Sequence, residues 1–134
     1  MAYIVDYSIF SGTAAITATA MPMPLHQTGD LLIAFVTMGS GAASVGAGSV
    51  PAAASWTINS DATVAAATTS VLRTLATGST NVLNLTTIDD YAITIVSVRD
   101  VDQTTPVDAI SVLGLNTATG APTSVAVSTT QANC

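Results

Sequence analysis

The sequence predicts an all-β fold, a single antiparallel β-sandwich that is jelly-roll-like and has about eight to ten short strands. Apolar and polar residues alternate with a period of two, and Thr, Val and Ile dominate the alternating segments. Gly, Pro, Asn and Asp collect between those segments, where turns need them. Helical periodicity is almost absent, and no linker divides the 134 residues into two domains.

The first two strands are predicted at residues 3–10 and 13–20. Ala and Ile alternate with Thr in the second of these segments. The Met-Pro-Met-Pro sequence at residues 21–24 ends it, because proline cannot donate a hydrogen bond to a strand ladder. Residues 27–30 (Gln-Thr-Gly-Asp) then form a turn.

Residues 31–38 are apolar on both faces, which predicts a central strand that is covered on both sides. Residues 39–54 are rich in Gly, Ala and Ser and have no period, so we expect a long surface loop that a neighbouring subunit could order. Residues 55–58 close this loop. Trp56 is the only tryptophan, and we expect it to cap one end of the core.

The clearest predicted hairpin joins residues 69–76 to residues 82–87 through a five-residue turn that contains Gly and Asn. In its second arm Leu83 and Leu85 point to one face. After the Asp-Asp turn at positions 89 and 90, residues 91–98 are again apolar on both faces, which predicts a second central strand.

The end of the chain is predicted to contain a polar loop followed by two shorter strands. The loop covers residues 100–108 and includes Pro106. The strands are expected at residues 109–113 and 124–128.

The composition suits a structural subunit better than an enzyme. The chain has 22 Thr, 13 Ser and 23 Ala, and it has neither Lys nor Glu. Hydrophobic residues make up 49% of the chain but aromatic residues only 4%. Because Ala buries little area, the predicted core is thin, and a partner subunit is expected to cover part of the apolar surface.

The charge excludes two classes of partner. Eight Asp and two Arg give a net charge of −6. Binding to nucleic acid or to an anionic membrane needs clustered cations, and two arginines far apart in the sequence do not supply them.

The single cysteine, Cys134, cannot form an internal disulfide. No signal peptide or membrane-spanning segment is visible, so we expect synthesis in the cytoplasm.

Few residues are candidates for chemistry, and we expect no catalytic residue and no cofactor. His26 is the only histidine; it has no second ligand nearby, Asp30 is a guess for an orienting carboxylate, and an exposed loop histidine is the expected state. Asp100, Asp102 and Asp108 are weak calcium candidates, because they share one loop but lack a known spacing. The alternative is that they cap turns.

Three residues are candidates for interactions: Trp56, Arg73 and Arg99. Arg99 is placed to form a local ion pair with Asp100 or Asp102. Arg73 lies in the middle of a predicted strand, so we expect it on an outer face or at an interface. Beyond Trp56, the aromatic residues that could contact a sugar are the tyrosines at positions 3, 7 and 91.

Three stretches together resemble β-sandwich domains of tailed-bacteriophage virion structural proteins of the capsid-decoration, head-fibre and tail-fibre types. They are the Gly-Asp-Leu-Leu strand within residues 28–36, the Ser-Trp-Thr at residues 55–57, and residues 95–102 leading into the Thr-Pro-Val-Asp at residues 105–108. In the turn at residues 99–102, Asp100 stands where those proteins have Gly, which puts the backbone geometry of that turn in question.

The resemblance implies a non-enzymatic virion protein, made in the host cytoplasm, that decorates or cements a capsid. Its expected partners are further copies of itself, as a homotrimer, and the major capsid protein or another virion protein. The alternative is a fibre domain that binds a host receptor or glycan through Trp56 and the 100–108 loop. An enzyme is a third possibility, which the absence of an acid–base pair disfavours. Residues 129–134 look like the start of a further strand, so residues 1–134 are expected to be the N-terminal part of a longer protein.

Overall fold

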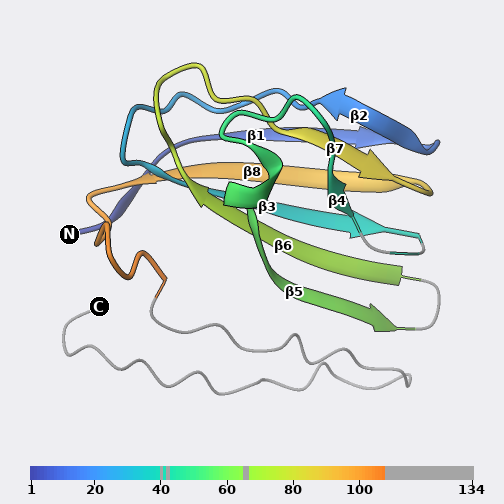
Figure 1. Ribbon diagram of the computed structural model, residues 1–134. Coiled ribbons are helices and arrows are strands. Elements are labelled where there is room, and N and C mark those ends of the chain that lie inside the picture. The colour runs from blue at the N-terminus through green and yellow to red at the C-terminus, as the bar shows by residue number, and fades with distance from the viewer. Residues whose placement is uncertain (40, 42, 65–66, 108–134) are drawn as a thin grey trace.

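The computed structural model describes residues 1–39, 41, 43–64 and 67–107, with the backbone alone for residues 58–64 and 67. The strands predicted at residues 109–113 and 124–128 lie outside these residues. Figure 1 shows the arrangement of the elements. They are β1 (Tyr3–Gly12), β2 (Ile16–Ala20), β3 (Leu31–Met38), β4 (Ser44–Val45), the 3-10 helix η1 (Ala53–Ser55), β5 (Thr57–Val64), β6 (Ala67–Leu75), β7 (Asn84–Thr87) and β8 (Tyr91–Arg99).

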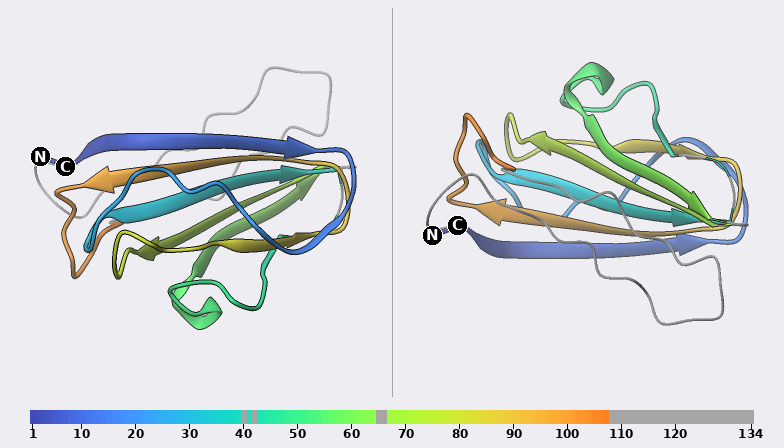
Figure 2. Two further views of the ribbon diagram at one scale, coloured as in Figure 1. Left: turned by 90° about the horizontal axis from the view of Figure 1, so that it is seen from above. Right: turned by 90° about the horizontal axis from the view of Figure 1, so that it is seen from below.

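The strands form two antiparallel sheets, so the all-β sandwich prediction is confirmed. One sheet has five strands in the order β1-β8-β3-β6-β5, and the other has three in the order β2-β7-β4. Most neighbours within a sheet are distant in sequence, as with β1 and β8. Seen from above and below, η1 stands out on one side of the molecule and β1 lies at the other (Figure 2). The jelly-roll arrangement stays a prediction.

The core lies between the two sheets and is supplied by alternate residues of β3, β8 and β7. β3 and β8 each pair on both sides, which confirms their central position in the sheet. The expectation that both faces are covered is wrong, because outer-face residues such as Phe35 are exposed. In β3 the inward residues are Leu32, Ala34, Val36 and Met38. From the other side come Leu85 of β7 and Leu83 just before it, both with 0% exposure, which confirms their shared direction. The inward face of β6 is more polar, with buried Thr and Ser around Leu72.

The predicted hairpin between residues 69–76 and 82–87 is wrong, because the two segments belong to different sheets. β6 already pairs with β3 on one side and with β5 on the other, so it has no free edge for the segment that follows. The chain instead crosses to the second sheet, where β7 pairs with β2 and β4. This crossing places Leu83 and Leu85 opposite the five-stranded sheet.

The long loop predicted over residues 39–54 is present over most of the described part of that segment, but part of it is ordered against the second sheet. It contains β4, and the backbones of Val50 and Val82 exchange hydrogen bonds of 2.7 and 2.8 Å. Ser49 is buried, and its hydroxyl accepts a hydrogen bond from the Asn84 backbone N–H at 3.0 Å. Gly46 lies so close to β2 that a Cβ atom there would be 2.7 Å from Ala18 Cα. The small residues therefore allow close approach between backbones.

β5 is a strand that we do not predict from the sequence, because residues 55–58 are expected only to end the preceding loop. Its sequence, Thr-Ile-Asn-Ser-Asp-Ala-Thr-Val, has no sustained apolar alternation. Within the described part of the chain β5 is an edge strand that pairs only with β6. Pairing with a formed neighbour stabilises a strand whose own sequence carries a weak signal.

Candidate functional site

Most of the predicted site residues lie at one end of the sandwich. At this end β3 and β5 begin, while β6 and β8 end. The antiparallel order therefore brings together Asp30, the segment around Trp56, the end of β6 after Arg73, and Arg99 with the loop that follows it. The sequence alone does not show that these residues are close in space, because they come from four separate segments.

Arg99 forms its ion pair with Asp30, 69 positions earlier, and not with the neighbouring Asp100 or Asp102 as expected. Arg99 Nε donates to Asp30 Oδ1 at 2.9 Å, and Nη2 donates to Oδ2 at 2.9 Å. Asp30 is 1% exposed and also accepts a hydrogen bond from the Gln27 backbone N–H at 2.9 Å. The parallel pair of hydrogen bonds is the geometry in which a guanidinium binds a carboxylate most strongly.

The ion pair between Arg99 and Asp30 suits a structural role better than proton transfer. The hydrogen bonds from Arg99 are the main reason that the pKa of Asp30 lies below its ordinary value of 3.8, although burial acts in the opposite direction. The hydrogen bond to Asp30 likewise raises the pKa of Arg99. Both groups therefore stay charged near neutral pH. Their effect is to hold the 27–30 turn against the end of β8.

The calcium candidates show a turn-capping arrangement. Asp102 Oδ1 accepts hydrogen bonds from the backbone N–H groups of Thr104 and Thr105, at 2.7 and 3.1 Å. Asp100 has a φ of 60°. This is the left-handed conformation that glycine adopts most easily, so the turn has the geometry that a glycine would favour. Asp108 lies outside the described residues, among which no group of three metal-ligating side chains is close enough to hold an ion.

His26 is half-buried and linked to two other segments, so the expectation of an exposed histidine is wrong. Its Nδ1 lies 2.6 Å from the Pro24 carbonyl oxygen, and its Nε2 accepts a hydrogen bond from the Asn81 backbone N–H at 3.2 Å. These partners require a proton on Nδ1 and none on Nε2. The ring therefore ties the 21–30 segment to the turn before β7, which leaves neither nitrogen for catalysis in this arrangement.

Trp56 lies in the core and is 5% exposed, which confirms the expected core position. Because so little of the ring is accessible, Trp56 is not available as a surface contact for a glycan. Tyr91 is also buried and lies against Phe10, with ring centroids 5.9 Å apart. Tyr3 and Tyr7 are 50% and 62% exposed, so of the predicted sugar-binding aromatics these two remain accessible.

Arg73 lies on the outer face of the five-stranded sheet, as expected. This outer face is the one directed away from the three-stranded sheet. Arg73 pairs in register with Ile33 of β3 and Thr57 of β5. It lines an open pocket of about 410 Å³ at the end of the sheet. Ser55 and Thr57 form one wall of this pocket, and Gln103, Thr104 and Pro106 form another.

Among the residues whose side chains are described, Arg73 forms no ion pair, whereas Arg99 is neutralised by Asp30. Arg73 Nε is also buried without a hydrogen-bond partner. An unpaired buried N–H costs free energy, and because Nε is enclosed, an outside acceptor in the pocket would reach the guanidinium through its terminal nitrogens. The pocket therefore combines one uncompensated cation with two loops that are distant in sequence.

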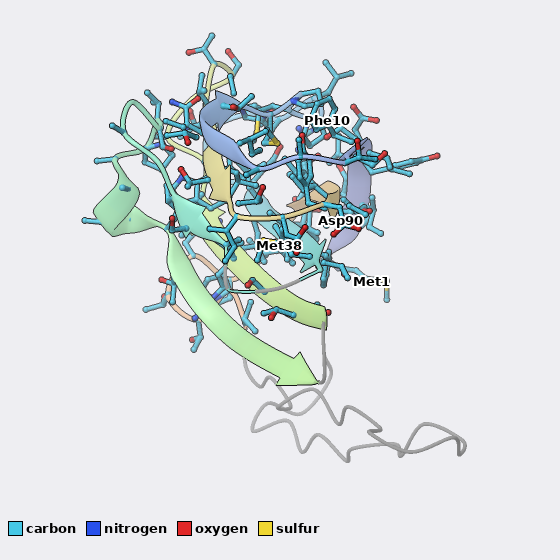
Figure 3. All side chains as sticks on the ribbon, turned by 90° about the vertical axis from the view of Figure 1, so that its right-hand side faces the viewer. Met1, Phe10, Met38 and Asp90 are labelled. Carbon is cyan, nitrogen blue, oxygen red and sulfur yellow. The ribbon has the colours of Figure 1, made fainter. Side chains whose placement is uncertain are left out.

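The opposite end of the sandwich has a smaller hollow of about 310 Å³. Figure 3 looks at this end and labels Phe10, Met38 and Asp90. Met38, at the end of β3, and Asp90, just before β8, both line the hollow. The Gly39 backbone N–H donates to the Asp90 carbonyl oxygen at 3.0 Å, which closes the connection between the two strands. The arrangement is that of a strand end, with the carboxylates of Asp89 and Asp90 both beside Gly39.

Comparison with models of protein families, with curated proteins and with solved structures gave no match. The described part of the chain also has no helix of the length and apolar character that crossing a membrane requires. Function therefore has to be argued from the surfaces and the pocket of this molecule.

Proposed function

We propose that the protein is a non-enzymatic structural subunit of a bacteriophage virion, of the capsid-decoration or cement type. It would act through contacts with further copies of itself, as a homotrimer, and with the major capsid protein or another virion protein. The phage context comes from the motif resemblance of residues 28–108. The role in assembly is supported by one surface of the sandwich, the β1 edge.

The β1 edge consists of the exposed apolar side chains of β1, an edge strand of the five-stranded sheet. Ile4, Tyr7 and Ile9 are 64%, 62% and 66% exposed. β1 is ten residues long and pairs only with β8 within the described chain, so its other backbone edge is open. A long apolar edge strand invites pairing with another chain unless charges or bulges protect it. Here a single carboxylate, Asp6, lies at an irregularity in the strand and accepts a hydrogen bond from the Leu25 N–H at 2.8 Å.

The apolar surface continues from the β1 edge across the sheet. Register aligns Ile9 with Thr94 of β8, and Thr94 with Phe35 of β3. Phe35 is 43% exposed although it belongs to a central strand. The outer face of a free sandwich is normally polar, because only the inner face is buried. An aromatic residue at this place is better suited to contact with another protein surface.

The charge distribution supports a second copy of the chain as the occupant of the β1 edge. The net charge of −6 opposes association of two copies in general. Ile4, Tyr7, Ile9 and Phe35 carry no charge, so two copies could meet there without bringing carboxylates together. Apolar burial contributes about 25 cal/mol per Å², which offsets the weak general repulsion once several such side chains are covered.

The test is the oligomeric state of the purified protein, measured by sedimentation velocity at micromolar concentrations. We expect a trimer, and we expect the double variant Tyr7→Lys with Ile9→Lys to be monomeric. The matched control is Ile88→Lys, because Ile88 is equally exposed at 62% but lies in the turn between β7 and β8. A wild-type monomer, or a trimer that the double variant leaves intact, would contradict assembly through the β1 edge.

The virion assignment is tested by quantitative mass spectrometry of purified particles from the source. A copy number comparable to that of the major capsid protein supports a decoration subunit that covers the shell. A few copies per particle would instead place the protein in an appendage, and its absence from particles would refute the assignment.

A second candidate function is a head- or tail-fibre domain that binds a host receptor or glycan. It is favoured by the pocket at Arg73, where residues from two distant loops meet around an unpaired cation. Cell adsorption that is lost in Arg73→Gln, with folding intact, would support this function.

A further inference from the structure

We infer that the pocket at Arg73 is a binding site for a carboxylated sugar residue, such as a uronic acid of a surface glycan. This inference deepens the second candidate function and names the class of its ligand. It does not depend on assembly through the β1 edge.

The charge in the pocket selects a singly charged ligand. Among the described residues that line it, Arg73 is the one that carries a charge. A guanidinium binds a carboxylate through two parallel hydrogen bonds. Nε of Arg73 is enclosed by the protein, so a ligand in the pocket would bind through the two terminal nitrogens of the guanidinium. A phosphate group or a polyanion carries more negative charge, which one cation in a protein of net charge −6 does not balance.

The rest of the lining suits a sugar ring. Ser55, Thr57 and Thr104 contribute hydroxyl groups, and none of the three has a side-chain hydrogen bond within the described chain. Pro106 and Leu75 add apolar surface for the C–H groups of a ring. The volume, about 410 Å³, lies within the range of about 300–1,000 Å³ that is usual for small-molecule sites.

The position of the pocket is compatible with assembly. Arg73 is on β6, three strand spacings (about 14 Å) from β1 but only one spacing from β3, which carries Phe35. A neighbour confined to the side chains of β1 would leave the pocket open, whereas a neighbour that also covers Phe35 would lie beside it. An assembled particle could then present many copies of a weak site, which would raise its overall avidity for a repetitive glycan.

The test is a titration of the isotope-labelled protein with D-glucuronate, followed by NMR chemical shifts of its backbone amides. We expect shifts at Ser55, Thr57 and Thr104 that saturate with millimolar affinity, and binding at least about tenfold weaker for Arg73→Gln. Arg73→Lys keeps the charge but loses the planar fork, so its affinity should lie in between. Thr69→Gln, on the same strand but outside the pocket lining, should bind like the wild type.

Three further ligands, methyl glucoside, acetate and inorganic phosphate, distinguish binding of the sugar ring from binding of the negative charge alone. Methyl glucoside lacks the carboxylate and should bind about tenfold more weakly than glucuronate. Acetate or inorganic phosphate that binds as tightly as glucuronate would overturn the sugar assignment, because it would show a bare anion site. Equal binding of glucuronate to wild type and Arg73→Gln, or the absence of shifts at the pocket, would overturn the inference altogether.

Sedimentation of the same samples keeps the two proposals apart. A trimer that does not bind glucuronate refutes the ligand and leaves the assembly proposal standing. A monomer that binds it refutes assembly through the β1 edge and leaves the ligand standing.

Discussion

At the scale of single residues, the chain uses its few polar and charged groups to fasten segments to one another. Asp30 receives the fork of Arg99 and a backbone N–H, and it is nearly inaccessible to solvent. His26 and Asn81 join a second pair of segments. The sequence predicts that Arg99 forms an ion pair, but it does not predict that the partner is Asp30. The carboxylates nearest to Arg99 in the sequence are not the one that binds it in the structure.

Substitution of Asp30 by Ala should destabilise the protein by about 2 kcal/mol, because it leaves the Gln27 N–H and the Arg99 guanidinium without their acceptor. Since the pKa of Asp30 is lowered in the folded protein, its contribution is present above the ordinary value of 3.8 and is lost as the pH falls below it. Urea unfolding at pH 7 and at acid pH measures both effects. If wild type and variant lost stability in parallel below pH 4, Asp30 would not be the cause.

Ala18 has a φ of 44°, which is an unfavourable conformation for alanine. Ala18→Gly should therefore stabilise the protein by about 0.5–1 kcal/mol, after allowance for the extra freedom of glycine in the unfolded chain. Thr17→Gly in the same strand is the matched control and should be destabilising, since the φ of Thr17 is not positive. Thermal unfolding of the two variants measures the difference, and equal losses in both would contradict the strain at Ala18.

At the scale of the elements, the sequence predicts strands well where both faces are apolar and poorly where pairing decides. The apolar runs of β3 and β8 identify both central strands, although only their inner faces are fully buried and Phe35 of β3 is exposed. β4 and β5 are missed, since their residues are small or polar and they form only against existing neighbours. The wrongly predicted hairpin after β6 has the same cause. Turn residues indicate that the chain reverses its direction, but they do not indicate which sheet the next strand joins.

The contact between β4 and β2 depends on Gly46. A Cβ atom at this position would lie 2.7 Å from Ala18 Cα, which belongs to the backbone and cannot rotate away. Gly46→Ala should cost about 1–3 kcal/mol, as overpacking usually does. Gly78 is the control, because an added Cβ meets no atom within 4 Å there. Denaturant unfolding of Gly46→Ala and Gly78→Ala should differ by this amount, and equal midpoints would refute the close approach.

At the scale of the whole molecule, the class of fold could be predicted but the candidate site could not. Period-two alternation and turn residues are local, so they identify an all-β sandwich without knowledge of its topology. The site depends on which strand ends share one edge, and that is decided by strand order. Arg73 carries a signal in the sequence, as one of only two cations, whereas Trp56 misleads because a lone aromatic can equally lie in the core.

Salt should strengthen assembly of the whole molecule. Copies with a net charge of −6 repel one another, and the Debye length falls from about 30 Å at 0.01 M ionic strength to about 8 Å at 0.15 M. The dissociation constant of the wild-type oligomer should therefore decrease over this range, as sedimentation equilibrium can measure. If association weakened as salt was added, attraction between charges would hold the copies together, and the apolar β1 edge would not be the main contact.

The pairing of β1 with β8 has a consequence for how the chain is made. β1 leaves the ribosome before the other described strands, yet its one partner among them, β8, ends at Arg99, 87 residues after β1 ends at Gly12. Synthesis at about 5–20 residues per second leaves this apolar segment unpaired for several seconds. Neighbouring nascent chains on one messenger RNA expose the same segment together. The order of synthesis thus gives β1 an opportunity to meet another copy of the chain before its own sheet is complete.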